Sequence, residues 1–521
     1  MMIVAEPGTL WVLQKEGRVM RRLLVVMGLG ILLLSWSWVE ATSWEEMGKL
    51  DEHWTLSGSL RTRWENWHWF NPGDLSGAAG ENDNNTYNFF ATQLRLGIKY
   101  QYDPWEAFVQ MQDTRLLSLP SDAGAPTPFG PLGLGALYFA HNQDQDQGRP
   151  FLKQAYLHIK NLQELLCLPG VSLKLGRFEY MDGLEVVPDP KEDPKLNWLK
   201  TMRISQRLIG PFGWSHVTRS FDGVQAGYDQ QKFNFTAFWS KPTQGGLEID
   251  AQDQIKDIDL AAATLTLKKG TLLPNSEARL FYIFYNDERD VLKVDNRPLA
   301  LRRSDGDDID ISTIGGNFIG AYPLGPGQAD LLLWAAYQTG DWGKLDQQSW
   351  AWALETGYQL SKLPWKPWLR AGYFQGSGDD NQTDSDHKTF FQIMPTARLY
   401  SFSTFYNLMN NEDFFLQLLL KPLDNLSCRT DFHNIRLNEE NDLWYFGAGA
   451  TRRDKIFGYG ARPSLGNKSL LNLIEFSISY DLTKYLNLNA YYSHLFGNEV
   501  VQEIYRGDDA DFWYLEANIK F

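Results

Sequence analysis

The chain has 521 residues, a formal net charge of -15 and a pI of about 5.1. This acidic balance, with no basic domain, excludes a typical nucleic-acid-binding protein. The mean hydropathy of -0.37 excludes a bundle of membrane-spanning helices, because each such helix needs roughly 20 predominantly apolar residues.

The N-terminal region predicts a secretory signal. Arg21 and Arg22 precede an apolar run over residues 23–34, and Ala41 follows at the spacing of a cleavage site. The run is short for a membrane span, which needs roughly 20 residues, so an uncleaved anchor is the less favoured alternative. We expect translation to start at Met20 and the signal to be cleaved near Ala41. The predicted domains are an extension with a signal peptide (1–41) and one large domain (42–521).

From about residue 55 onward, apolar and polar residues alternate in segments separated by turn residues. In the first segment, Leu56, Leu60 and Trp64 share one face of a strand, whereas Arg61 and Arg63 share the other. Continuing this way predicts strands near residues 55–69, 88–101, 105–114, 151–161, 171–180, 219–229, 232–241, 258–268, 277–286, 311–322, 329–340, 349–361, 365–377, 412–421, 426–437, 470–482, 486–497 and 512–521.

This even tally of about 18 strands, joined by alternating short and long connections, predicts an all-β fold. The expected architecture is a single antiparallel transmembrane β-barrel with short periplasmic turns and long extracellular loops. The 20 Trp residues suit the aromatic girdles of such a barrel, although aromatic content alone does not exclude a soluble all-β protein. Cys167 and Cys428 fall near turns on opposite sides of the barrel. We expect no intrachain disulfide, which needs Cα atoms within about 7 Å.

The predicted long connections carry much of the acidic charge, for example in residues 305–310, 378–386 and 508–511. The net charge therefore describes the outer loops more than the pore. Solvated loops are the favoured interpretation of these runs. A calcium site is the alternative, but none of them matches an EF-hand loop.

A barrel of this strand number leaves an aqueous channel. Arginine pairs a sugar carboxylate through two parallel hydrogen bonds, so a series of weak arginine sites would let an anionic polymer move from one to the next. The alternative is that these arginines pair with lumen carboxylates and brace the wall. By alternation, the basic candidates for the substrate path are Arg61, Arg63, Arg95, Lys99, Arg370 and Arg429.

The last ten residues, 512–521, alternate strictly between apolar and polar side chains. This ending resembles the C-terminal signal strand of bacterial outer-membrane β-barrels, which implies assembly by the barrel assembly machinery. The apolar face, which would meet lipid and act as the membrane-insertion signal, includes Trp513, Leu515, Ile519 and Phe521.

Two stretches, Gly176-Arg177 and Arg219-Ser-Phe-Asp-Gly-Val224, together with residues 395–400 and with Asn411, Pro422 and His433, resemble the alginate export family of outer-membrane barrels. The resemblance runs from about Trp54 to Phe521. It implies an 18-stranded barrel in the outer membrane, surrounded by lipid and lipopolysaccharide, that passes a uronate polysaccharide outward through an electropositive constriction. A periplasmic export scaffold is an implied partner. By resemblance, Arg177, Arg219 and Asp222 are constriction candidates, and residues 378–411 are a candidate inward-folded loop.

Two other functions stay open. A general or nutrient-uptake channel would have the same architecture with a different cargo. An outer-membrane enzyme would need a nucleophile and a base held together, and the sequence has no Gly-x-Ser-x-Gly, no His-Glu-x-x-His and no metal-spaced Cys/His cluster. The interior histidines, His158 and His433, are therefore expected to be structural. We expect no catalytic residue, metal or cofactor.

Overall fold

The structure is a computed structural model that describes residues 48–75, 82–163, 167–396, 400–403 and 405–521. The chain divides into two units, Met1–Leu50 and Asp51–Phe521. The predicted signal peptide falls in the first unit and lies outside the described residues. The barrel strands all belong to the second unit.

Within the described residues, eighteen antiparallel strands form the wall of a closed barrel. They are β1 (Trp54–His68), β2 (Thr86–Tyr102), β3 (Trp105–Leu117), β4 (Gln147–Ile159), β5 (Val171–Phe178), β6 (Phe221–Asp229), β7 (Phe233–Pro242), β8 (Ile258–Leu267), β9 (Ser276–Asp287), β10 (Ile309–Leu324), β11 (Gly327–Trp342), β12 (Leu345–Gln359), β13 (Trp368–Gly376), β15 (Asn411–Leu423), β16 (Leu426–Arg436), β19 (Ser469–Asp481), β20 (Leu486–Gly497) and β21 (Asp509–Lys520).

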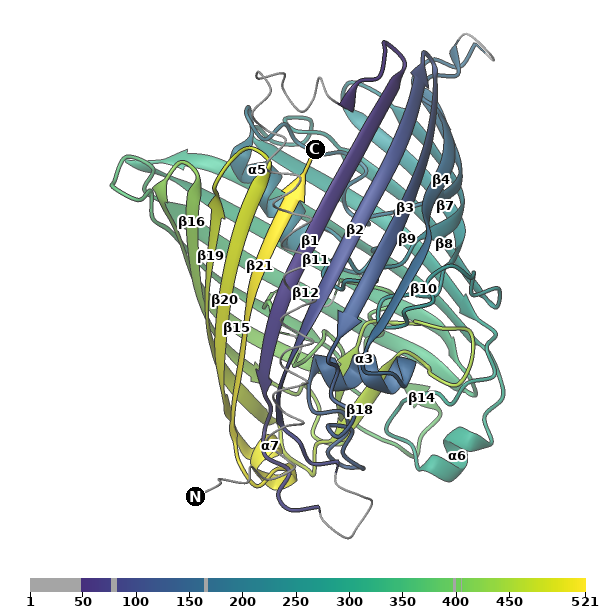
Figure 1. The fold of residues 1–521 in the computed structure, drawn as a ribbon, viewed down its shortest axis with the longest axis vertical. Coiled ribbons are helices and arrows are strands. Elements are labelled where there is room, and N and C mark those ends of the chain that lie inside the picture. Colours follow the sequence, from purple (N-terminus) through teal and green to yellow (C-terminus); the bar gives the residue numbers. More distant parts are fainter. Residues whose placement is uncertain (1–47, 76–81, 164–166, 397–399, 404) are drawn as a thin grey trace, which may run out of the picture. The chain divides into compact units, whose positions relative to one another are not determined.

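The first and last strands close the barrel. β1 pairs with β21 from Ser59↔Lys520 to His68↔Asp511, and the two lie side by side in Figure 1. The predicted all-β fold and strand number are thus confirmed. One boundary differs: β11 and β12 continue to a turn at Gly343 and Lys344, where the sequence suggested a connection of about eight residues. Gly343 has φ +61, a left-handed conformation that suits glycine.

Apart from that turn, long loops lie at one end of the barrel and short turns at the other. The connections contain α3 (Leu134–Asn142), α5 (Pro194–Leu199), the π-helical turn η2 (Lys200–Ile204), α6 (Leu299–Arg303), α7 (Glu499–Ile504), β14 (Asp386–His387) and the separate hairpin β17 (Leu443–Gly447) with β18 (Tyr459–Pro463). Both cysteines are free thiols, Cys167 exposed and Cys428 partly buried.

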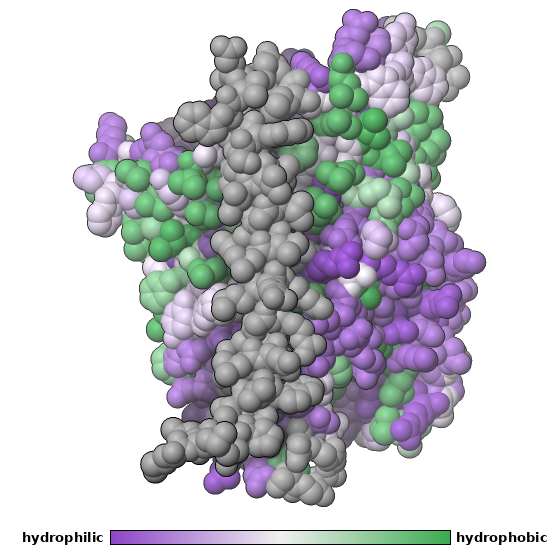
Figure 2. Space-filling view, in the orientation of Figure 1, coloured by the Kyte–Doolittle hydropathy of each residue, from purple (hydrophilic) through white to green (hydrophobic). Residues whose placement is uncertain are grey.

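The outer face of the wall is apolar near the short turns. Along β1, the outward residues Trp54, Leu56 and Trp64 are each about two-fifths exposed, with tryptophans at both ends of the run. Trp513 of β21 packs edge-on against Trp64 at 4.9 Å between ring centroids. Figure 2 shows hydrophobic residues gathered toward the short-turn end and hydrophilic residues toward the long-loop end. This pattern is that of a wall whose apolar band faces lipid.

Candidate functional site

One long loop, residues 179–220 between β5 and β6, runs through the barrel interior. Its helix α5 reaches the short-turn end, because the Nζ of Lys195 donates to the backbone oxygen of Gln328 at 3.3 Å. Lys269, in the turn between β8 and β9, pairs with Asp193 at the start of α5. Figure 1 shows α5 near the end of the barrel at which the C-terminal strand finishes. The lumen is therefore partly filled along its whole length.

A buried ionic cluster fixes this loop to the wall. Glu355 of β12 is fully buried and accepts hydrogen bonds from Arg203 of the loop at 2.8 Å and from Arg370 of β13 at 3.0 Å. Arg370 also donates to Asp330 of β11 at 3.2 Å, and its guanidinium stacks 4.9 Å from the Trp198 ring. A buried carboxylate is costly unless cations offset its charge, and the loop supplies one of those cations, Arg203.

A second buried cluster holds the first part of the same loop. Arg279 of β9 donates to Asp182 at 2.6 Å and to Glu185 at 2.8 Å. Nearby, Lys200 of η2 pairs with Glu277 of β9. The loop is thus anchored by ion pairs to β9 and β12, by a hydrogen bond to β11 and by the stacking of Trp198 on Arg370 of β13.

The candidate inward-folded loop, residues 377–410, also enters the barrel. Met394 donates its backbone N–H to Leu208 at 2.8 Å, and Gly210 donates to Met394 at 2.8 Å, so the two inward loops pair with each other. The Tyr400 hydroxyl accepts from Arg207 at 2.6 Å. The expectation of an inward fold is confirmed for this loop. Residues 397–399 of the stretch that carries the family resemblance lie outside the described residues.

The returning end of the loop 179–220 passes through the lumen and contacts the inner faces of β1, β2 and β3. We call residues 211–220 the crossing segment. Arg61 donates to the backbone oxygens of Gly213, at 2.8 Å, and of Ser215. Gln93 of β2 and Gln112 of β3 both donate to the oxygen of His216, at 2.7 and 3.0 Å. Side chains of the wall therefore bind the backbone of the crossing segment directly.

Beyond the crossing segment, toward the long loops, the described interior is packed. Its inward side chains are at most 1% exposed at Trp67, Phe89, Leu116, Leu495 and Phe512. These side chains join α3, α7 and the β17–β18 hairpin in one apolar cluster with members such as Tyr138, Trp444 and Val501. The crossing segment therefore marks the level at which the lumen changes from accessible to closed.

On the other side of this level, the two halves of the wall differ. We call β7–β13, β15 and β16 the filled wall, and β19–β21 with β1–β6 the open wall. Inward residues of the filled wall such as Thr264, Asn234 and Gln417 are buried, whereas Ser59, Asn489 and Asn518 of the open wall are only partly buried. Because residues 182–207 of the loop pack against the filled wall, the accessible part of the lumen lies along the open wall.

Two lysines of the open wall differ from the inward-facing arginines in their ion pairing. Among the residues that the structure describes, neither Lys99 nor Lys174 forms an ion pair with a carboxylate. The ammonium of Lys174 lies 4.8 Å from the ring of Tyr156, which packs against Phe108 at 5.5 Å. Lys99 is the register partner of Phe108. The accessible lumen thus presents two aromatic rings between two cations.

The predicted substrate-path arginines face the lumen but already have partners. Arg63 binds Glu516 and Glu65, and Arg95 binds Gln112 at 2.8 Å and Glu179 at 3.2 Å. Arg429 binds Asp431 and Glu475. With Arg61 and Arg370 described above, these contacts match the alternative in which arginines brace the wall and the loops.

The three constriction candidates require correction. Arg177 and Asp222 are register partners joined by two hydrogen bonds of 2.6 and 2.8 Å. The inward residues of β5 are Lys174 and Phe178, so alternation turns Arg177 outward, and Asp222 with it. Arg219 lies in the crossing segment and donates to the backbone oxygens of Ala448 and Ala450. None of the three lines the accessible lumen.

Sequence reasoning missed the loop cations that fill the lumen. Arg203 and Arg207 bind residues about 150 to 190 positions away in the chain. The sequence does contain a pattern that could have predicted buried cations in this loop. In an otherwise acidic chain, apolar residues surround four cations, Lys195, Lys200, Arg203 and Arg207. Such cations need buried anions, and inward-facing Glu355 is one.

In the long-loop region, two carboxyl groups face each other. Burial raises the pKa of Asp379 to about 7, and Asp442 adds to this effect by its charge. Burial also raises the pKa of Asp442 to about 6, against hydrogen bonds from Thr389 and Tyr445. The Asp442 carboxylate accepts the backbone N–H of Asp379 at 3.0 Å. This contact joins the loop 377–410 to the start of the β17–β18 hairpin.

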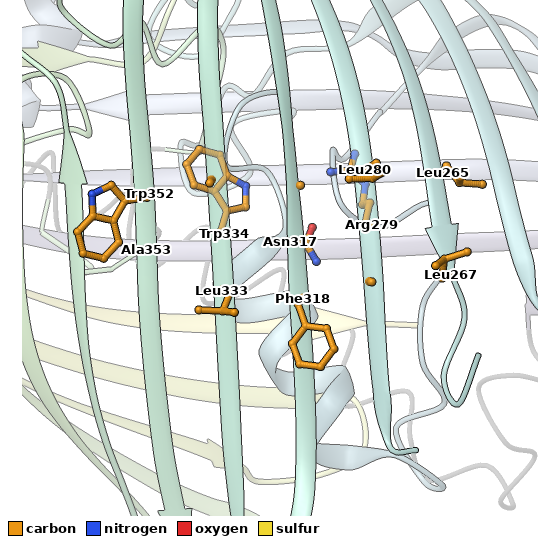
Figure 3. Close-up of a pocket in the computed structure, with 13 residues that line it drawn as sticks. Leu265, Leu267, Arg279, Leu280, Asn317, Phe318, Leu333, Trp334, Trp352 and Ala353 are labelled. Atoms are coloured by element: carbon orange, nitrogen blue, oxygen red, sulfur yellow. The ribbon is translucent and has the colours of Figure 1, made fainter. Parts of the chain in front are cut away.

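A hollow in the wall between β8 and β12 is on the outer face and is not a substrate site. Gly316 and Ala335 are outward register partners without large side chains. Around them stand Leu280, Leu333 and Trp352 (Figure 3). Leu280 is 65% exposed, so the hollow faces lipid.

Among the described residues, no helix is long and apolar enough to cross a membrane. The Alginate export family model matches residues 74–505. A search of curated proteins found no match.

Solved structures with a similar fold include the Acinetobacter baumannii channels OccAB4 and OccAB1. OccAB4 has 10% identity and a TM-score of 0.54 over 91% of this chain and 99% of its own. OccAB1 has 11% identity and a TM-score of 0.52 over 90% and 96%. The outer membrane protein opdK from Pseudomonas aeruginosa has 9% identity and a TM-score of 0.51 over 89% and 98%. Family and fold are those of channels. The chain belongs to the alginate export family and is an outer-membrane β-barrel channel.

Proposed function

We propose that the channel passes an anionic polysaccharide, alginate or a related uronate polymer, by diffusion along the open wall. The observation that carries this proposal is the pair of lysines, Lys99 and Lys174, which lack a carboxylate partner among the described residues and flank Phe108 and Tyr156 in the accessible lumen. A cation suits the carboxylate of a uronate, and an aromatic face suits the C–H face of its ring.

The crossing segment is the gate in this proposal. Arg61 and Arg63 donate to its backbone oxygens at Gly213, Ser215 and Trp214. A uronate carboxylate is a stronger acceptor for a guanidinium than a neutral carbonyl oxygen. Cargo arriving along the open wall would therefore compete for these donors and loosen the segment. In this proposal the arginines hold the crossing segment closed until cargo binds them. They replace the predicted series of weak arginine sites.

The proposed partners of the channel are those that membership of the family implies. The barrel assembly machinery would insert the chain, lipid and lipopolysaccharide would surround it, and a periplasmic export scaffold would deliver the cargo to the short-turn end.

A second candidate is an uptake channel for small anionic solutes. It is favoured by the narrowness that the two inward loops impose, and by the similar fold of OpdK from Pseudomonas aeruginosa, whose structure with vanillate gives a TM-score of 0.51 at 9% identity. For such a solute, a few cations beside aromatic rings would suffice.

The test is conductance in a planar bilayer under a salt gradient. We expect the wild type to prefer anions and uronate oligomers to reduce its current. The Lys99→Glu/Lys174→Glu variant should lose both properties. The control is Lys241→Glu, because Lys241 pairs with Asp259 on the outer face and should not affect the pore.

The length of the oligomer separates the two candidates. A polymer channel should be blocked more strongly as the oligomer lengthens, because more carboxylates engage the wall at once. An uptake channel should be blocked equally by monomers such as glucuronate. A wild-type channel that prefers cations and ignores uronates would overturn the polymer proposal.

A further inference from the structure

A compact group of ionisable side chains lies inside the barrel where β15, β16 and β19 meet. Asp431 and Glu475 are register partners, and His433 follows two residues along β16. All three are at most 2% exposed. The Nε2 atom of His433 lies 3.9 Å from Asp431 Oδ2 and 3.9 Å from Glu475 Oε1. These three atoms lie within 4.8 Å of one another.

The tautomer of His433 is fixed by its other nitrogen. Nδ1 lies 2.9 and 3.1 Å from the two oxygens of Asp413. An ionised carboxylate can only accept, so Nδ1 carries the hydrogen and donates it. Among the described residues, Nε2 has no hydrogen-bond partner, because 3.9 Å is too long for a hydrogen bond. A buried nitrogen is therefore aimed between two carboxylates and bound to neither.

The charges around this nitrogen do not balance within the protein. Asp413, Asp431 and Glu475 supply three negative charges. Arg429 supplies one positive charge, since it donates to Asp431 and Glu475 and also to the backbone oxygen of Tyr400. A protonated His433 would leave one negative charge uncompensated, and a neutral His433, the form that binds a metal ion, leaves two in a buried place, which is costly. A single divalent cation on the His433 side would balance them.

We propose that His433, Asp431 and Glu475 form a binding site for a divalent transition-metal ion such as Zn²⁺. An imidazole nitrogen with two carboxylate oxygens is a ligand set that zinc accepts. Two ligands about 2.1 Å from a tetrahedral ion lie roughly 3.4 Å apart, so the separations of 3.9 Å between Nε2 and the two oxygens need to shorten by about half an ångström. Arg429 binds the same two oxygens and would have to shift away from the ion. A carboxylate that orients a ligating histidine, as Asp413 does, is the usual outer partner of such a site.

The same carboxylates hold the inward loop 377–410. The hydroxyl of Ser401 donates to Glu475 at 2.6 Å, and that of Tyr406 donates to Asp413 at 2.9 Å. An ion at this site would therefore fasten the loop to the wall. The ligands come from two strands, which explains why no metal-spaced motif is visible in the sequence. The inference is independent of the cargo.

The experiment uses the full-length protein, purified in detergent, stripped with a chelator and then reloaded with Zn²⁺ or Co²⁺. We expect the wild type to retain one tightly held Zn²⁺ by elemental analysis. Co²⁺ should give the visible absorption of a low-symmetry site, and Zn²⁺ should raise the unfolding temperature. His433→Gln should lose the ion, the Co²⁺ spectrum and the thermal shift.

The control His53→Gln should retain all three properties, because His53 is at the short-turn end, away from β16, and its ring pairs with Glu52 on the surface. Heat-modifiable gel mobility verifies that each variant is folded. If His433→Gln does not fold, Glu475→Gln is read in the same way. A wild-type protein that retains no ion, or ion binding unchanged in a folded His433→Gln or Glu475→Gln variant, would overturn the proposal.

Discussion

The filled wall and the open wall belong to one sheet, obey the same alternation and yet have opposite roles. On the filled wall, charged residues such as Glu355 and Arg370 are fully buried and bind the loop 179–220. On the open wall, Lys99 and Lys174 remain partly exposed to the lumen. An inward-facing charge is thus buried in an ion pair or left exposed to the lumen, depending on whether a loop packs against it.

The largest effect is expected from loosening the crossing segment, which separates the accessible part of the lumen from the closed part. Replacing residues 211–217 by a Gly/Ser sequence of equal length removes Phe212, Trp214 and the ordered acceptors of Arg61. Single-channel conductance should rise several-fold, because a Gly/Ser segment without these side chains and ordered contacts would no longer obstruct the lumen. The control is the same replacement of α6 (Leu299–Arg303), which has no buried residue. Unchanged conductance in the first variant would show that the crossing segment is not the barrier.

The next effect compares ion pairs on the two walls. Glu355→Gln leaves Arg203, Arg207 and Arg370 without their shared anion, and breaking such a buried cluster costs about 3–5 kcal/mol. The matched change Glu106→Gln on the open wall removes a pair with Lys160, of 2.8 Å and partly exposed, and should cost about 1 kcal/mol or less. The free energy of unfolding, measured with denaturant and tryptophan fluorescence, should show this difference. Equal losses would contradict the division into two walls.

How much of this arrangement could be predicted depends on the range of the interactions. Alternation along single strands located the inward faces of Arg61, Arg95 and Lys99 correctly, because it is a local property of the backbone. The motif around Arg177 led to a wrong prediction of an inward side chain. Arg177 lies three positions after inward-facing Lys174, and an odd number of positions places two residues on opposite faces of a strand. The pairing of Arg203 with Glu355 spans 152 residues, and no local pattern reports a contact of that range.

The smallest effect concerns the long loops that close the extracellular end. The pKa values of Asp379 and Asp442 are raised to about 7 and 6 from an ordinary 3.8. The packed loop therefore holds protons that an opened loop releases, and its packing loses stability as the pH rises from about 4 to about 7.

Hydrogen exchange of residues 377–396 should accordingly be faster at pH 8 than at pH 5, after correction for the intrinsic rate. Asp379→Asn mimics the protonated acid and should reduce this difference. Asp380→Asn is the control, because Asp380 is exposed and pairs with Lys388. An identical pH response in the wild type and Asp379→Asn would rule out Asp379 as the group responsible.

The central claim is that water and anions enter the lumen only along the open wall. Single cysteines at Ser59 and Asn489, and at Thr264 and Gln417, can be introduced after Cys167 and Cys428 are replaced by serine. Their reaction with charged methanethiosulfonate reagents applied from the periplasmic side tests the claim directly. We predict rapid reaction at the first two positions, faster with the anionic reagent than with the cationic one, and almost none at the other two. Equal rates at all four positions, or faster reaction with the cationic reagent, would contradict the account.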